Sequence, residues 1–410
     1  MRHGGVSLFF VLAACAASEP GPPALQDGPL AERLEARLVA KEADLIAFRR
    51  DLHRHPELSG DEQRTAGAVA ARLRALGFSV RTGVGGHGVV GTLRGDRPGP
   101  VVAFRADMDA VPSTAPDPVS FPSVTPGIRH ICGHDVHTTV GIALAEAFSA
   151  VRDSLAGTVM LVFQPAEERA TGARAMLGAG VFGSERPVAI YALHTAPLEV
   201  GQLGTTAGAL MASRDLVRIT ATGSGDRSAA LAAARRIVEG VATVDPSRQF
   251  DGATGDFILV QFNGGDASSV AATLSLATEA ARTGARTTIT REVAALAIPS
   301  VSLAVDYQAR FIDGVTNDSA LVTAGSAAIA ATPGAGSVVT IRSIVPAFSE
   351  DFGAFQSQVP GVMYFLGVSN AARGTVGYPH SPAYIADEGA ILVGARAMAA
   401  VLLARLAAGG

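Results

Sequence analysis

The sequence predicts an α/β protein with two domains. Its 410 residues exceed the length that one hydrophobic core usually organises, so two domains are expected. Hydrophobic residues make up 48% of the chain and charged residues 17%, a balance typical of globular α/β proteins. Three apolar runs also suit buried strands, and each of them ends in polar residues. The net charge of −4 and the lack of any Lys/Arg run give no support for nucleic-acid binding.

The N-terminus has the pattern of an export signal. A basic start precedes an apolar run, residues 6–14, that is too short to span a bilayer as a mature helix. The run ends in Leu12-Ala13-Ala14-Cys15, which resembles the lipobox of bacterial lipoproteins and implies lipidation of Cys15. An ordinary secretory signal is the alternative. We therefore expect a lipoprotein-type signal over residues 1–15, a flexible tether over 16–29, and a periplasmic or membrane-anchored protein.

Two helices are predicted before the first strand. Residues 30–52 have an amphipathic helical pattern that Pro56 stops, and residues 61–76 form a second helix that Gly77 closes. His53 and His55 flank the first stop. A histidine at a helix end is more often a capping or surface group than a ligand, so we assign neither of them a function.

Each of the three apolar runs ends in residues that could carry chemistry. Residues 100–104 precede Arg105, Asp107 and Asp109, residues 157–163 precede Glu167 and Glu168, and residues 188–193 precede His194. Open α/β sheets bring such residues together at the carboxyl ends of their strands. Simple turn residues are the alternative for each group. Adjacent carboxylates repel one another unless a cation or protons offset the repulsion, however, so the coincidence favours one shared site.

A nine-residue segment, 129–137, predicts a metal site. It holds three of the nine histidines, His130, His134 and His137, together with Cys132 and Asp135. Thiolate, imidazole and carboxylate groups bind divalent transition metals. The alternative is a buried free cysteine beside incidental polar residues. A helical pattern follows over residues 138–151, so we expect the segment in the loop that leads into this helix.

The second domain is predicted between residues 214 and 314. Its pattern is α+β, with helices over 229–240 and 288–296 and strands over 257–262, 269–278 and 301–311. Residues 30–213 and 315–410 would then form the first domain. The latter part has a helical pattern over 317–331 and closes with an amphipathic helix over 391–406.

Seven segments, in this order and at this spacing, resemble one known family: residues 51–58, 105–112, 130–137, 163–168, 192–194, 349–352 and 380–382. The family is that of the M20 metallopeptidases, and the resemblance is to its amidohydrolase branch. That branch holds hippurate hydrolases, plant auxin-conjugate hydrolases, N-acyl-amino-acid hydrolases and related carboxypeptidases. The resemblance implies a catalytic domain with a mainly parallel sheet and helices on both faces, and an inserted α+β lid that often mediates homodimer formation.

The resemblance also implies a centre of two divalent metal ions per subunit. Zinc or manganese is expected, with nickel or cobalt as alternatives. Glu167 matches the family's general base, Asp109 matches the aspartate that orients a ligand, and His137 becomes a supporting group. The implied metal ligands are Cys132, which would bridge the ions, and His134, Glu168, His194 and His380.

The lid departs from the family pattern. The family's Gly-x-Gly-Gly-His segment, whose histidine steadies the oxyanion, corresponds to Gly223-Ser-Gly225-Asp226-Arg227 without a histidine. A later asparagine is replaced near Ser269, and an expected arginine is missing near residues 277–280. Loss of an oxyanion donor typically lowers turnover by about two to three orders of magnitude, and Arg227 is the nearby substitute cation.

The leading hypothesis is an enzyme that cleaves an amide bond of an N-acyl-amino acid or small peptide with metal-activated water. The alternative is a non-catalytic extracytoplasmic protein that binds peptides or acyl-amino acids. All implied ligands and Glu167 are present together, which favours the enzyme, whereas the altered lid favours the binding protein.

Overall fold

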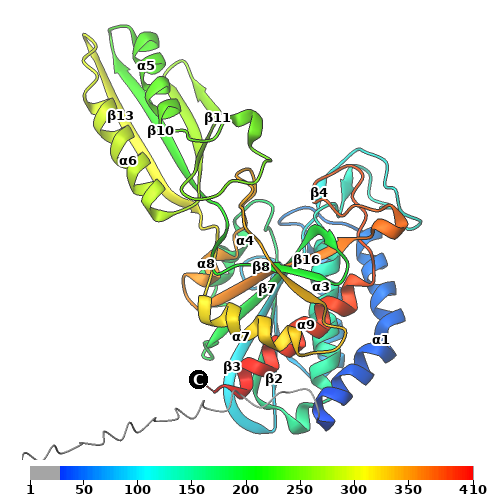
Figure 1. Cartoon of the computed structure of the whole chain (residues 1–410). Coiled ribbons are helices and arrows are strands. Elements are labelled where there is room, and N and C mark those ends of the chain that lie inside the picture. Colours follow the sequence, from blue (N-terminus) through cyan, green and yellow to red (C-terminus); the bar gives the residue numbers. More distant parts are fainter. Residues whose placement is uncertain (1–27, 410) are drawn as a thin grey trace, which may run out of the picture.

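The computed structural model describes residues 28–409, which form a larger α/β part, the body, and a smaller part, the lid (Figure 1). The lid comprises residues 213–312 and projects from the body in Figure 1. The predicted signal, Cys15 and most of the predicted tether lie outside the described residues.

An eight-stranded sheet organises the body. Its four central strands run parallel, so their carboxyl ends meet at one edge. Three of the four are the apolar runs predicted from the sequence. The strand order is β1 (Ser79–Thr82), β2 (Val89–Arg94), β6 (Ala156–Gln164), β3 (Arg97–Asp107), β7 (Ala189–Glu199), β16 (Gly361–Ser369), β8 (Gln202–Thr205) and β15 (Ser337–Thr340).

Helices cover both faces of this sheet, which confirms the predicted architecture. Alternate side chains of β3 explain the layering, because Val102 and Phe104 enter one apolar core and Ala103 enters the other. The first core includes α1 (Pro29–Arg54), α2 (Gln63–Ala75), α3 (His134–Ser149), α7 (Ser319–Ala330) and α9 (Ala390–Ala407). The second includes α4 (Gly172–Gly178) and α8 (Gly353–Gln356).

The closing helix differs from its prediction. We expected an amphipathic helix, but α9 is buried along most of its length because it packs against α1, α3, α7 and the sheet. Among residues 28–409 it is the one helix long and apolar enough to cross a membrane, and 72% of that span is buried inside the protein. Such burial is typical of a core helix.

The lid has its own sheet and core. Its four antiparallel strands are ordered β11 (Ile258–Asp266), β12 (Ser269–Leu276), β10 (Ser213–Gly223) and β13 (Val301–Ile312). Helices α5 (Arg227–Gly240) and α6 (Glu279–Ala294) pack on this sheet. The prediction placed the second helix at residues 288–296; it begins earlier because Thr278 caps it by accepting a hydrogen bond from the amide of Ala281.

The lid touches the body beyond its two connecting strands. Ala253 of the lid and Ile344 of the body exchange backbone hydrogen bonds of 2.8 Å in both directions, and the amide of Ala347 donates to Gln249 at 3.0 Å. These bonds tie a lid loop to the segment that precedes Glu350. The remaining short elements are β4 (Val111–Pro112), β5 (Ile128–Arg129), β9 (Gly208–Met211), β14 (Val315–Asn317), η1 (Arg152–Ser154), η2 (Pro246–Arg248) and η3 (Ala371–Arg373).

Candidate metal centre

The fold brings the predicted catalytic and metal-binding residues to one place. Glu167 and Glu168 follow β6, His194 lies on β7, and His134 opens α3. His380 comes from the loop before α9, where its amide donates to Ile131 at 2.7 Å. This meeting point is the edge of the sheet where the parallel strands end, as the pattern of polar strand ends predicted.

The predicted loop position of the segment around Cys132 is only half right. Helix α3 begins at His134, so His134 and His137 lie in its first turns, whereas His130 and Cys132 lie in the loop before it. Gly133 makes this junction feasible. Its φ of 90° is left-handed, and a Cβ there would lie 2.3 Å from the hydroxyl of Tyr384 and 2.5 Å from that of Thr195. Only glycine therefore fits between the thiol and the helix.

Two groups of potential ligands share Cys132. In each group the ligand atoms all lie within 4.8 Å of one another; one group is Cys132, His134 and His194, and the other is Cys132, Glu168 and His380. The Sγ of Cys132 lies 3.4 Å from Nε2 of His194, and Oε1 of Glu168 lies 3.1 Å from Nε2 of His380. A thiolate common to two groups is suited to bridge two ions.

Unpaired polar atoms show that these residues fit metal ions. Nε2 of His134 is buried without a hydrogen-bond partner, and buried Oε1 of Glu168 has Nε2 of His380 beside it but no well-formed hydrogen bond, a costly state for polar groups. Burial, together with the charges of Glu168, Glu167 and Asp107, raises the pKa of the Cys132 thiol well above its ordinary value. Bound divalent cations would offset this accumulated negative charge and favour the thiolate. The donor set of sulfur, imidazole and carboxylate fits such ions.

Asp109 holds the ligands in place. One carboxylate accepts hydrogen bonds from Ser59 at 2.6 Å and from the amides of Glu167 and Glu168 at 3.2 and 3.0 Å. It also lies 3.3 Å from Nδ1 of His134, which leaves Nε2 of that ring directed away. Burial alone would raise the pKa of Asp109, but the hydrogen bonds and charge of His134 lower it below its ordinary value. Asp109 thus stays ionised and orients His134.

His137 is engaged on both sides of its ring. Nδ1 lies 2.6 Å from Asp107, and Nε2 accepts the amide hydrogen of Thr195 at 2.8 Å. Because neither nitrogen is available, His137 supports the centre and His134 keeps the unpaired nitrogen. His130 is also buried, but it belongs to neither group that shares Cys132.

Glu167 lies beside the two groups that share Cys132, in a separate cluster of three carboxylates. Its carboxylate approaches those of Glu350 and Asp351, with the three potential ligand atoms within 4.8 Å of one another. Burial raises the pKa of Glu167 well above its ordinary value, and the charge of Glu350 raises it further. Bound divalent cations would lower this proton affinity towards the range in which a carboxylate takes up a proton from water.

The partners of Glu350 and Asp351 were not predicted from the sequence. Arg105 lies 2.8 Å from Glu350, 3.2 Å from Asp351 and 2.6 Å from Asp107, and it is fully buried. Burial and the neighbouring Glu350 raise the pKa of Asp351 to about 8. The Ser349-Glu-Asp-Phe352 motif was recognised in the sequence without a role, and its two adjacent carboxylates were the available signal.

His53 is not the surface or capping group that the sequence suggested. It is buried, and its two ring nitrogens lie 2.9 Å from Asp135 and 3.0 Å from Asp117. Asp135 in turn pairs with buried Arg49 at 2.7 Å. The cause of the wrong prediction is the loop of residues 113–127, which folds over the end of α1 and supplies Asp117.

We expect His53 to stabilise the fold more strongly at acidic than at alkaline pH. Burial would lower its pKa, but the two carboxylates overcome this and raise it above the ordinary 6.5. The folded protein therefore holds the proton more tightly, so this stabilisation is complete below that value and is lost as pH rises through the folded-state pKa. In urea unfolding, His53→Gln should cost more stability at about pH 6 than at about pH 9. His55→Gln, at a partly exposed ring, is the control; an equal cost of His53→Gln at both pH values would contradict the expectation.

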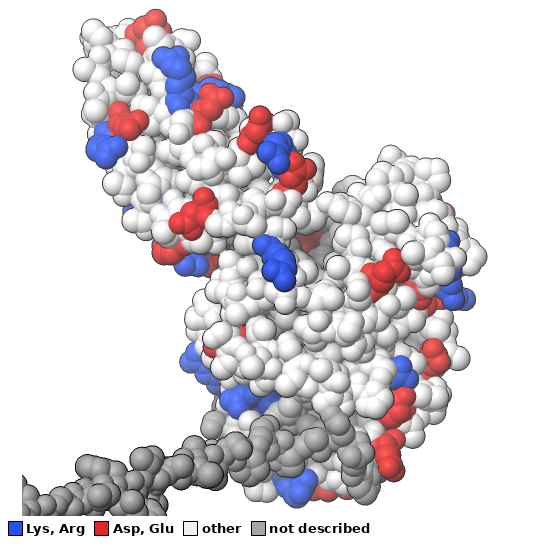
Figure 2. Space-filling view, in the orientation of Figure 1, with Lys and Arg blue, Asp and Glu red and all other residues white. Residues whose placement is uncertain are grey.

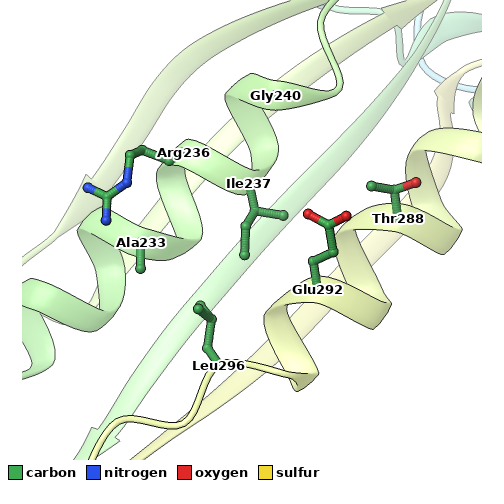
Figure 3. A pocket seen from close by; sticks show the side chains of 7 residues that line it. All are labelled: Ala233, Arg236, Ile237, Gly240, Thr288, Glu292 and Leu296. Carbon is green, nitrogen blue, oxygen red and sulfur yellow. The ribbon is translucent and has the colours of Figure 1, made fainter.

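The surface is hollowed between lid and body, with acidic side chains visible inside the hollow and a basic one beside it (Figure 2). A separate pocket of about 370 Å³ lies between α5 and α6 of the lid (Figure 3). Ile237 and Leu296 point into it, and Arg236 and Glu292 lie at its sides (Figure 3). This pocket contains none of the predicted site residues.

Fold and site together define a class of protein: a metal-dependent hydrolase with a dinuclear centre at the ends of parallel strands and a lid above it. The chain belongs to the peptidase family M20/M25/M40, which it matches over residues 103–404. This membership confirms the predicted family.

Individual relatives support the amidohydrolase branch. The chain is 32% identical to the N-acetylcysteine deacetylase of Bacillus subtilis over 377 residues, covering 85% of this chain and 93% of the relative. It is also 32% identical to the IAA-amino acid hydrolase ILR1-like 4 of Arabidopsis thaliana, covering 86% and 83%. The crystal structure of the Bacillus subtilis YxeP protein, a dinuclear metal-binding peptidase of the M20 family, superimposes with a TM-score of 0.72 at 30% identity, covering 90% and 99%. The protein is therefore a metal-dependent enzyme that hydrolyses amide bonds.

Proposed function

We propose that the protein hydrolyses the amide bond of an N-acyl-amino acid or a small peptide, with Glu167 as the general base. The observation that carries this proposal is the position of Glu167. Its buried carboxylate belongs to neither group that shares Cys132, yet it lies within 4.8 Å of ligand atoms of His134 and Glu168, 3.8 Å from Nε2 of His134. The relatives that act on N-acetylcysteine and on amino-acid conjugates support the substrate class.

The roles of the side chains follow from their contacts. Metal ions bound by the two ligand groups would acidify a water molecule and polarise the substrate carbonyl. Glu167 takes up the proton of that water and passes it to the leaving amine, which requires a carboxylate that is not itself tied up as a ligand. Glu168 and His380 serve as ligands, and Asp109 keeps both His134 and the Glu167–Glu168 turn in position. We expect zinc or manganese from the mixed sulfur, nitrogen and oxygen donors.

The altered lid leaves Arg227 as the substitute for the family's oxyanion-stabilising histidine. Asp226 caps α5 by accepting a hydrogen bond from the amide of Ala229 at 2.9 Å, and Arg227 is the first residue of that helix. Strand β10 leads from the body to the far end of the lid, where α5 begins (Figure 1). We therefore propose that Arg227, the first residue of α5, acts in the site of a second copy of the chain, through the homodimer that the family resemblance implies.

The test is a metal-loaded sample assayed against a panel of N-acyl-amino acids and dipeptides. Metal analysis should find about two ions per chain, because two ligand groups share one thiolate. Amine release should be lost on chelation and return when zinc or manganese is added. A sample that binds metal but hydrolyses no member of the panel would refute the proposed function and favour a binding protein.

Export and anchoring are proposed from the sequence alone. Residues 1–27, including the lipobox-like segment and Cys15, lie outside the described residues, so the periplasmic or membrane-anchored location is a prediction.

A further inference from the structure

Arg214 is a half-buried cation at the base of the lid. It is the second residue of β10, and its neighbour Asp215 points into the lid, where it pairs with Arg282 at 3.0 Å and accepts from Tyr307 at 2.9 Å. Because side chains alternate along a strand, Arg214 points the other way, towards the body. There its Nη2 donates to the carbonyl oxygen of Ala347.

The half-buried guanidinium of Arg214 has no carboxylate partner among the described residues, unlike the four most deeply buried arginines. Four fully buried arginines each lie within 4.0 Å of a carboxylate: Arg49, Arg105, Arg129 and Arg282. Within the described residues Arg214 has no such ion pair, its one acceptor is the Ala347 carbonyl, and its Nε is buried without a partner. A partly desolvated guanidinium without an anion is costly, so this position is suited to an anionic partner that binds there.

Arg214 contacts the segment that leads to Glu350. Ala347, its acceptor, lies three residues before Glu350, which belongs to the same cluster as Glu167. The ring of the next residue, Phe348, packs 6.0 Å from that of Tyr378, two residues before His380. Burial lowers the pKa of Arg214, and the charge of Glu167 is the one neighbouring charge that counteracts this. Arg214 therefore faces the site from the lid side.

The covalent structure of an N-acyl-amino acid places its free carboxylate close to Glu167. In an N-acyl-amino acid, a single carbon separates the leaving nitrogen from the free carboxylate. Glu167 protonates that nitrogen in the proposed function, so the carboxylate must lie close to Glu167. The planar guanidinium fork matches a carboxylate with two parallel hydrogen bonds.

We propose that Arg214 binds the free carboxylate of the substrate and so selects N-acyl-amino acids and peptides with an unblocked C-terminus over their carboxamides. This assignment rests on the proposed function for the position of the scissile bond. In this proposal the base of the lid recognises the substrate carboxylate, and the far end of the lid, which departs from the family pattern, does not.

The test compares N-benzoylglycine with N-benzoylglycinamide, measured as benzoate release by the metal-loaded protein. The parent should prefer the carboxylate. Arg214→Leu should lower kcat/KM for N-benzoylglycine by about 30-fold to 1,000-fold, the usual effect of removing one partner of a buried charge pair, and change that for the carboxamide less than about threefold. Arg214→Lys, which keeps the charge without the fork, should fall in between. Arg218→Leu is the matched control, since Arg218 lies on the same strand and donates to Ser269 at 3.0 Å.

Equal losses on both compounds would overturn the proposal, because they would mean that Arg214 only holds the segment around Ala347. No loss on either compound would overturn it as well. If the parent hydrolyses neither compound, the proposed function fails on this pair, and calorimetric binding of N-benzoylglycine to the same metal-loaded proteins decides. Binding lost in Arg214→Leu and kept in Arg218→Leu would support the carboxylate site; binding that is unchanged, or absent from the parent, would refute it.

Discussion

Replacing Glu167 by Gln is expected to lower kcat by about 10²-fold to 10⁴-fold, the usual contribution of a general acid–base group, while the metal content stays near that of the parent. The reason is geometric. The Glu167 carboxylate lies in the cluster of Glu350 and Asp351, whereas the two groups that share Cys132 do not include it. The amide of Gln keeps the shape of the side chain but cannot take up a proton. Turnover and metal stoichiometry should be measured on the same preparation.

Glu239→Gln is the matched control, because Glu239 lies exposed on α5 and has no place in the site. A Glu167→Gln protein that has lost its metal would instead make Glu167 a ligand. If parent and variant bind an acyl-amino acid equally and neither turns it over, the protein is a binding protein on an enzyme scaffold, and the proposed function is wrong.

Replacing Cys132 by Ser is expected to affect both metal sites at once. Cys132 is the member shared by the two ligand groups, so a hydroxyl there weakens two sites with one change. Metal content should fall from about two ions to one or fewer, and kcat/KM should fall roughly 10³-fold, since the metal contribution is worth several kcal/mol. Elemental analysis beside kinetics on a zinc- or manganese-loaded sample provides the measurement.

The control is Cys15→Ser, which alters the other cysteine and leaves the thiol at position 132 in place. It should keep both ions and full activity. If Cys15 carries a lipid, this variant should also move from the membrane fraction to the soluble fraction. A Cys132→Ser protein that retains two ions and normal turnover would contradict the bridging role.

Most of the candidate site could be predicted from the sequence because its metal-binding residue types occur at predicted strand ends and next to a predicted helix start. Cys132, His134, Glu168 and His194 are metal-binding types at strand ends or next to a helix start, and parallel strands bring such ends to one edge. Family resemblance then supplied His380, which no local pattern connects to the others. The need for glycine at position 133 is explained only by the folded contacts with Tyr384 and Thr195.

The supporting network could not be predicted in the same way. Arg105 and Glu350 are 245 positions apart, and His53 and Asp117 are 64 apart, so no periodicity relates them. A buried ion pair depends on which segments the fold places side by side, and an isolated histidine or arginine has the same sequence pattern whether it is exposed or buried. For this reason His53 was assigned to the surface and Arg105 was left without a partner.

By itself, the sequence determined the α/β class, the family, the amide-hydrolase chemistry and the identity of the potential ligands, because residue types at strand ends and their spacing carry that information. The tertiary structure alone decided which histidine keeps an unpaired nitrogen, that His53 and Arg105 are buried in ion-pair networks, and that Arg214 contacts Ala347 at the base of the lid without a carboxylate of its own. These properties depend on distances between segments far apart in the chain, which only the packing of lid, sheet and helices sets.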